Sequence, residues 1–108
     1  MRTLKMSKVY IMFDSGHNFN ASLEYGEIIY LTNIKLHRFD TDKIYKVFLK
    51  ELINSDPEDF ILISALNVMN AIACCIMVAV HHKINLLIYN NMTEAYVKKT
   101  IDFTDIGE

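Results

Sequence analysis

Apolar residues fall along the chain in short continuous runs and in helical stripes, and this pattern predicts most of the elements. Lys8 to Phe13 is an almost continuous apolar run followed by polar residues, which is typical of a strand buried on both faces of a sheet. Glu27 to Leu31 predicts a second strand, which the chain enters through a turn at Gly26. Residues 33–39 alternate between apolar and polar side chains, a pattern that allows either an edge strand or a loop.

The clearest helix in the pattern begins near residue 41. Asp40 or Thr41 can cap its start, and Asp42 places an acid in the first turn, where the helix dipole favours negative charge. Its apolar side lies opposite several lysines, as expected of a helix that covers one face of a sheet. That side consists of Ile44, Val47, Phe48, Leu49, Leu52 and Ile53. Turn residues at 54–57 then end the helix.

The 21 residues from Phe60 to Val80 contain only three polar positions and allow two interpretations. By length the run could span a bilayer. However, Ser64, Asn67 and Asn70 lie toward its middle, where a spanning helix tolerates polar side chains least. The flanking residues favour a strand over 60–64, a polar turn, a helix over 67–83 and a further strand over 84–89. The preferred interpretation is therefore strand–helix–strand, with no membrane span expected.

The C-terminal part predicts an antiparallel return strand over 95–103, after a turn at 90–93. Its charged residues, Lys98, Lys99 and Asp102, suit the edge of a sheet. The predicted order is β-β-(β)-α-β-α-β-β, an α/β fold with a mixed sheet of about five strands, two helices and one right-handed βαβ crossover. A chain of 108 residues has the size of one domain, so residues 1–108 are expected to fold as a single unit.

The second helix is apolar on every side. Twelve of the thirteen residues from Val68 to Val80 are apolar, with Asn70 as the exception. Such a helix must be covered all round, and a chain of this length has little material for that. We expect it to pack on the sheet with one side and on a second copy of the chain with the other. The alternative cover is the 14–27 loop with the C-terminal tail. Small residues that would allow close helix approach are Ala71, Ala73, Cys74, Cys75 and Ala79, and the expected interface residues are Met69, Ala73, Ile76, Met77 and Val80.

The charge and the cysteines of the chain indicate which classes of partner and which cellular compartment to expect. The net charge is −2, and the 11 basic residues are interleaved with 13 acids, so no basic stripe for nucleic acid is present. Cys74 and Cys75 are adjacent, where a disulfide between them would strain the backbone. Residues 1–10 contain no apolar run long enough for a signal peptide. A cytoplasmic protein is therefore expected. The excess of Lys, Ile and Asn fits an AT-rich coding genome, as in many low-GC bacteria and their phages.

Three polar loops are expected at one edge of the sheet. If the strands that begin at Lys8, Phe60 and Ile84 are parallel, their carboxyl ends meet where open α/β sheets bind ligands. The start of the second helix would also offer backbone amides to an anion such as phosphate. The candidate ligand-binding residues are Asp14, Ser15, Gly16, His17, Asn18, Ser64, Asn67 and Asn90. All of them are also ordinary turn and cap residues, which is the alternative interpretation.

No catalytic or metal-binding set is complete in the sequence. His81 and His82 lie about 20 Å from the start of the second helix, too far to join Asp14 and His17 around a metal ion. Ser15 and His17 lack an orienting acid, and the chain has no Walker or dinucleotide motif. No metal or cofactor is expected, and whether the protein is an enzyme stays open. The first hypothesis is a small cytoplasmic interaction protein that self-associates through its second helix, such as a phage or bacterial accessory or regulatory factor. The second is a small enzyme or ligand-binding domain for a phosphate-bearing, nucleotide-like molecule at the loop after the first strand.

Overall fold

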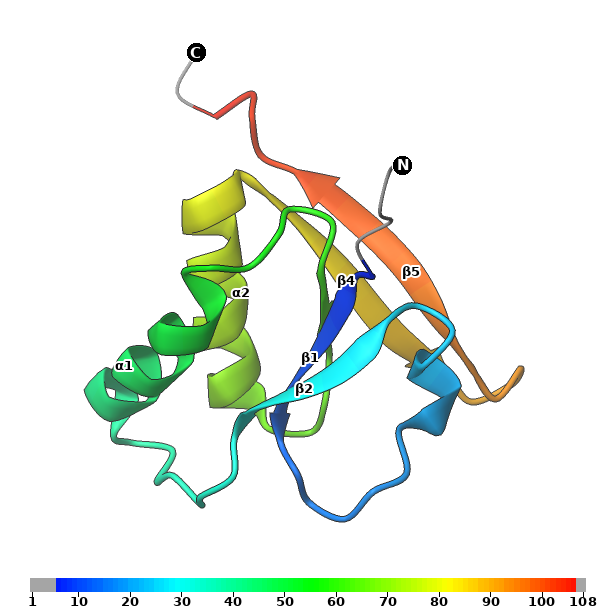
Figure 1. Cartoon of the computed structure of the whole chain (residues 1–108), viewed down its shortest axis with the longest axis horizontal. Coiled ribbons are helices and arrows are strands. Elements are labelled where there is room, and N and C mark those ends of the chain that lie inside the picture. The colour runs from blue at the N-terminus through cyan, green and yellow to red at the C-terminus, as the bar shows by residue number, and fades with distance from the viewer. Residues whose placement is uncertain (1–5, 107–108) are drawn as a thin grey trace, which may run out of the picture.

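The computed structural model describes residues 6–106 and contains one five-stranded mixed sheet with two helices (Figure 1). The strands are β1 (Lys8–Phe13), β2 (Glu27–Thr32), β3 (Phe60–Leu62), β4 (Lys83–Asn90) and β5 (Ala95–Asp102). The helices are α1 (Thr41–Leu52) and α2 (Asn67–His81), with a short 3-10 helix η1 (Asn20–Ser22) after β1. The α/β class and the predicted order of elements are confirmed. The first five residues of the N-terminal stretch considered for a signal peptide lie outside the described range.

The optional strand over residues 33–39 does not form. Thr32 Oγ1 accepts a hydrogen bond from the backbone N–H of Ile34 at 3.1 Å, which turns the chain away from the direction of β2. His37 Nδ1 accepts from the N–H of Phe39 at 3.2 Å in the same segment. Local side-chain bonds of this kind compete with sheet pairing. The segment is therefore an irregular loop between β2 and α1.

The strand order is β2-β1-β3-β4-β5. β1 pairs in parallel with β2 and β3, and β3 pairs in parallel with β4, whereas β5 runs antiparallel to β4. The carboxyl ends of four strands thus share one edge of the sheet. The chain moves outward from β1 to β2 and then returns past β1 to β3, so the topological switch point lies between β1 and β3.

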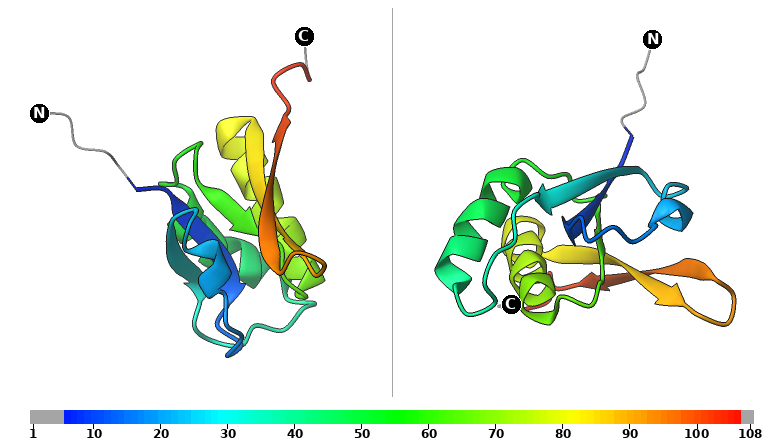
Figure 2. Two further views of the ribbon diagram at one scale, coloured as in Figure 1. Left: turned by 90° about the vertical axis from the view of Figure 1, so that its right-hand side faces the viewer. Right: turned by 90° about the horizontal axis from the view of Figure 1, so that it is seen from below.

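The two faces of the sheet are covered by different elements. Both helices lie on one face, whereas the β1–β2 loop with η1 lies over the other (Figures 1 and 2). The helix-side core joins Tyr10, Met12, Ile61 and Ile84 of the strands to buried side chains of α1 and α2. The loop-side core consists of Val9, Ile11, Phe60, Leu62, Leu87 and Tyr96, with Phe19, Tyr25, Ile28 and Tyr30 packed against it.

The β1–β2 loop is held firmly against the sheet. Tyr25 Oη donates a hydrogen bond to the carbonyl oxygen of Tyr96 at 2.9 Å, and its ring meets Phe60 edge-on. The hydroxyl of buried Ser22 donates to the carbonyl of Phe19 at 2.7 Å. A Cβ at Gly26 would lie 2.2 Å from the carbonyl oxygen of Ser7, so only glycine allows this close passage before β2.

A buried amide links three strands. Asn85 of β4 is 2 % exposed, and its Nδ2 donates to the carbonyl oxygens of Pro57 at 3.1 Å and Asp59 at 3.3 Å. Its Oδ1 accepts from the hydroxyl of Thr100 on β5 at 2.6 Å. The side chain thereby connects the entry to β3 with both strands of the β4–β5 hairpin.

A buried carboxylate fixes the amino end of β1. Asp59 accepts hydrogen bonds from the backbone N–H groups of Lys8 at 2.9 Å and Asp56 at 2.8 Å. Burial and the negative charge of Asp59 raise the pKa of nearby Tyr10 to about 12. The Asp59 carboxylate therefore connects the start of β1 to the segment before β3 through two backbone hydrogen bonds.

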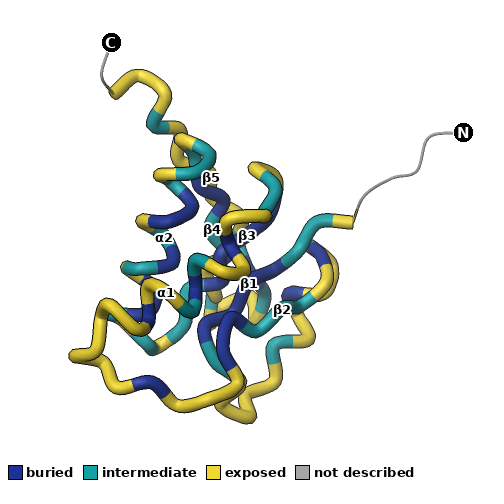
Figure 3. Tube along the Cα trace, turned by 60° about the vertical axis from the view of Figure 1, so that its left-hand side comes forward, coloured by how far each residue is buried: buried dark blue, intermediate teal, exposed yellow. Residues whose placement is uncertain are grey.

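The apolar run from Phe60 to Val80 divides into β3, a four-residue connection and most of α2, as predicted. Within residues 6–106, no helix combines the length and the apolar character needed to cross a bilayer. Buried and exposed positions alternate along α2 (Figure 3). Its exposed residues include Ala71, Cys75 and Ala79, which are spaced four apart.

Candidate functional site

The predicted ligand-binding residues all lie near the carboxyl edge of the parallel strands, but they do not form one site. His17 and Asn18 line a cavity on the loop-covered face of the sheet, together with Tyr89. Asn67 lines a different cavity, between the β2–α1 loop and the start of α2. The first predicted loop thus lies beside Tyr89 of β4, the second belongs to another cavity, and Asn90 of the third lines neither of the two.

Several of the predicted residues make the contacts of ordinary turns. Asp14 Oδ1 accepts from the N–H of Gly16 at 3.1 Å, and Gly16 has a φ of +86°, which favours glycine. Asn90 Oδ1 accepts from the N–H of Met92 at 2.9 Å. The carbonyl oxygen of Ser64 accepts from Asn70 Nδ2 at 2.6 Å, so Asn70 ties the β3–α2 connection to the helix. Ser15 is exposed, and none of these contacts involves it.

The cavity at Asn67 has a basic wall, and we refer to it as the basic cavity. It measures about 550 Å³, and one side is formed by the β2–α1 loop with Lys35, His37, Arg38 and Phe39. The guanidinium of Arg38 lies 5.0 Å from the centre of the Phe39 ring. The sequence pattern left this segment open between an edge strand and a loop, and these basic residues were not among the predicted ligands.

The cavity at His17 has aromatic walls, and we refer to it as the aromatic cavity. It measures about 330 Å³ and is lined by His17, Asn18, Phe19, Asn20, Ala21, Tyr89 and Tyr96. The rings form two edge-to-face pairs, His17 with Phe19 at 6.1 Å and Tyr89 with Tyr96 at 5.2 Å between centroids. Phe19 and Tyr89 were not predicted, because only the fold of the loop over the β4–β5 hairpin brings them together.

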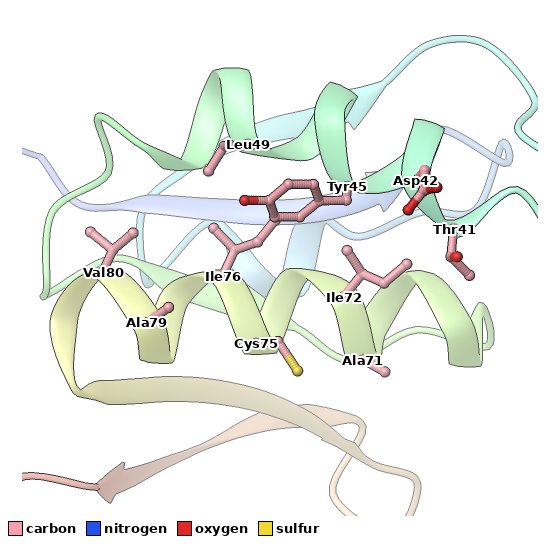
Figure 4. Close-up of a pocket in the computed structure, with 10 residues that line it drawn as sticks. All are labelled: Thr41, Asp42, Tyr45, Leu49, Ala71, Ile72, Cys75, Ile76, Ala79 and Val80. Atoms are coloured by element: carbon pink, nitrogen blue, oxygen red, sulfur yellow. The ribbon is translucent and has the colours of Figure 1, made fainter.

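A groove of about 480 Å³ runs between the two helices (Figure 4), and we refer to it as the α1–α2 groove. Tyr45 and Leu49 come from α1, and the exposed stripe of Ala71, Cys75 and Ala79 comes from α2. Ile72, Ile76 and Val80 also line it, and its polar residues are Thr41 and Asp42, at the beginning of α1. The groove surface is therefore largely apolar.

The structure places most of the expected interface residues inside the chain's own core. Met69, Ala73, Ile76 and Met77 are at most 7 % exposed, since they pack against the sheet and α1. Only Val80 is partly exposed. A helix that is apolar all round gives no signal for which side faces the sheet, and here the large residues turn inward. The exposed side of α2 is therefore the small-residue stripe, which contains none of the expected interface residues.

The two cysteines differ in their surroundings, and both are free thiols. Cys74 is half-buried, and burial together with the neighbouring Cys75 raises its thiol pKa to about 11. Cys75 is exposed in the α1–α2 groove. Over residues 6–106 no three His, Cys, Asp or Glu side chains are grouped so that they could hold a metal ion.

A serine–histidine pair at the ends of the helices was not predicted. Ser55 Oγ lies 2.8 Å from His81 Nε2, and it donates to the carbonyl oxygen of Leu52 at 2.6 Å. Ser55 Oγ also lies 3.2 Å from Met77 Sδ, and which of Ser55 and His81 donates to the other depends on the tautomer of the histidine ring. The pair connects the segment just after α1 with the last residue of α2.

Comparison with known proteins adds one assignment. No curated protein and no solved structure matches this chain. A family model described as Phage Pam3 gp32-like protein matches residues 5–103, which is nearly the whole chain. The match supports the phage origin that the composition suggested. The chain belongs to the Phage Pam3 gp32-like protein family.

Proposed function

We propose that this protein is a small interaction protein that self-associates through the α1–α2 groove and acts as an accessory or regulatory factor of a phage. The observation that carries the proposal is the outer side of α2. Ala71, Cys75 and Ala79 are exposed there, and no charged side chain occurs between Asn67 and Val80. Solvent-facing sides of helices are normally rich in charged residues, so an uncharged stripe indicates a covered surface.

The groove suits a folded partner better than a small ligand. Ligand cavities carry a few convergent polar groups that fix orientation, whereas here only Thr41 and Asp42 at one end are polar. The helix side of the β4–β5 hairpin also carries exposed apolar side chains. Ile88 and Ile101, which strand alternation places on that side together with the exposed Lys99, are 41 % and 45 % exposed. A surface that includes two helices and two strands is wider than a bound peptide would cover.

A second copy of the chain is the partner that this surface matches. In a two-fold contact each surface packs on itself, so the small-residue stripe of one copy meets the same stripe of the other. Small side chains let the two helices approach closely, and the absence of charged side chains from residues 67–80 avoids repulsion between identical residues. Such interfaces commonly bury about 800 Å² per partner, which requires a surface broader than the groove alone.

Sedimentation over a range of protein concentrations tests the proposal. The wild-type chain is expected to form a dimer or larger assembly, and Cys75→Glu or Ala79→Glu is expected to give folded monomers, because both positions are exposed. Ala73→Glu is unsuitable, since this side chain is fully buried. Thr93→Glu adds the same charge at an exposed turn outside the groove and should leave assembly unchanged.

Thiol chemistry gives a second measurement of the same surface. Because Cys75 lies near the middle of α2, a short bismaleimide should link it to its copy across the two-fold axis. Cys75→Ser should remove this crosslink. A wild-type chain that stays monomeric at high micromolar concentration would contradict the proposal.

A second candidate function is binding of a phosphate-bearing, nucleotide-like molecule, now at the basic cavity instead of the loop after β1. The observation that favours it is the basic wall, since neither Lys35 nor Arg38 forms an ion pair in the described part of the chain. Inorganic phosphate or ATP should then raise the melting temperature, and Lys35→Ala with Arg38→Ala should abolish the shift. Lys43→Ala, an exposed lysine outside this cavity, serves as the control. No shift in the folded wild-type chain would exclude this candidate.

A further inference from the structure

The aromatic cavity combines ring faces with unused polar groups. Asn18 Oδ1 accepts from the N–H of Asn20 at 2.9 Å, which leaves the Asn18 amide nitrogen available as a donor. The Asn20 carboxamide and the hydroxyls of Tyr89 and Tyr96 make no hydrogen bond within residues 6–106. The cavity therefore offers donors and acceptors mixed together beside apolar ring surfaces.

The lining of the aromatic cavity contains no lysine, arginine, aspartate or glutamate. Its only ionisable groups are His17 and the two tyrosines. A phosphate group would find no lysine or arginine there, in contrast to the basic cavity. The chemistry of the lining thus favours an uncharged ligand.

The walls of the cavity are held in place before any ligand binds. The hydrogen bond from Tyr25 to the Tyr96 carbonyl and the buried Ser22 fix the loop that carries His17 to Ala21. Tyr89 and Tyr96 are paired across the β4–β5 ladder. Walls that are already ordered reduce the conformational entropy lost on binding.

We propose that the aromatic cavity binds a neutral saccharide ring. The C–H face of a sugar packs against an aromatic ring, and each sugar hydroxyl can both donate and accept, as the amides and phenol groups here require. A nucleobase would also stack, but the phosphates that accompany it in a nucleotide would lie beside a lining without lysine or arginine. The site is also at the carboxyl edge of the strands, next to the loop that follows β1. The proposal is independent of self-association.

The test is a titration of the wild-type chain with glucose, galactose, N-acetylglucosamine, maltose and cellobiose, followed by saturation-transfer NMR and calorimetry. A single ring in an open site should bind with a dissociation constant on the order of 1 mM. Tyr89→Ala should weaken binding by roughly tenfold, because it removes an exposed ring face. Tyr89→Phe keeps the ring and should stay within about threefold of the wild type.

The control is Phe39→Ala, which removes a ring that is 75 % exposed and lies outside the aromatic cavity. It should leave saccharide binding unchanged. The proposal is overturned if no sugar of the panel binds, if adenosine or uridine binds more tightly than every sugar, or if binding survives Tyr89→Ala. Sedimentation of Tyr89→Ala should match the wild type, which separates this result from a failure of the proposed self-association.

Discussion

The helix side and the loop side of the sheet are both apolar, but they are built from different residues. On the helix side the core is almost entirely aliphatic, with Phe48 and Tyr10 as its fully buried rings. On the loop side the covering side chains Phe19 and Tyr25 are aromatic, and they pack against a core that includes Phe60 and Tyr96 of the strands. The type of covering element explains the difference.

A helix satisfies its own backbone hydrogen bonds, so it can lie directly on a sheet and fill the gap with branched aliphatic side chains. A loop carries unpaired backbone groups and stays farther out, so it covers the sheet through large rings with a polar end. Tyr25 does this when its ring packs on Phe60 and its hydroxyl reaches the carbonyl of Tyr96. The surfaces that stay exposed differ accordingly: a largely apolar groove between the helices on one side, and a cavity of rings and amides on the other.

The largest expected effect is the difference in stability lost when one phenylalanine on each side of the sheet is replaced by alanine. Phe48→Ala on the helix side should lower the free energy of unfolding by about 3–5 kcal/mol, because this ring is fully buried. Phe19→Ala on the loop side should cost roughly 1 kcal/mol, since Phe19 is only partly buried. Urea denaturation measures both. Equal losses would show that the loop contributes as much as a helix does.

The buried tyrosine of the helix side should make stability depend on alkaline pH. The pKa of Tyr10 is raised from 10 to about 12 in the folded chain, so its proton is held more tightly there than in the unfolded chain. This contribution is fully present below pH 10 and is lost as the pH rises to 12. Relative to Tyr10→Phe, the wild type should lose on the order of 2 kcal/mol across this range. A difference between the two that stays constant with pH would refute the assignment.

The hydrogen bond from Tyr25 that anchors the β1–β2 loop should contribute less to stability than the Phe48 ring or the Tyr10 proton. Tyr25→Phe removes the hydrogen bond to the Tyr96 carbonyl and should cost about 1 kcal/mol, with faster amide exchange in η1. Tyr30→Phe removes a hydroxyl that has no hydrogen bond in the described residues and provides the control. Similar losses for both variants would mean that the anchor contributes little.

The smallest expected effect is a difference in the rate at which the two thiols of α2 are labelled. Iodoacetamide should label Cys75 before Cys74, because Cys75 is exposed whereas burial raises the pKa of Cys74 to about 11. Self-association should slow the labelling of Cys75 as the protein concentration increases. Mass spectrometry of the two single Cys→Ala variants distinguishes the sites. Faster labelling of Cys74 would contradict the described burial.

Most of the fold could be predicted because it depends on local patterns. The continuous run at Lys8–Phe13 and the amphipathic pattern of α1 each identify one element, and the structure agrees with both. The loop at residues 33–39 could not be decided, since the bonds of Thr32 and His37 that replace sheet pairing leave no mark on apolar periodicity.

The candidate sites could be predicted only in part, because they depend on which face each loop takes. The sequence placed His17, Asn18 and Asn67 at the correct edge of the sheet, and the structure then separates them onto two faces. Tyr89 lines the aromatic cavity because the fold places it against a loop about 70 positions earlier in the chain. A local sequence pattern does not indicate such a long-range contact. The same limit affected α2, whose inward side depends on the volumes of its side chains in the core.

The amide of Asn85 also bears on how the last strand finds its place during folding. If β5 shifted by one residue, Thr100 would move to the other face, and the Asn85 oxygen would be buried without its partner. That error would cost roughly 1–3 kcal/mol, whereas the exposed residues of β5 would scarcely distinguish the two alignments. Asn85 thus acts together with Tyr96, the buried side chain of β5 in the loop-side core, to set the register of this edge strand.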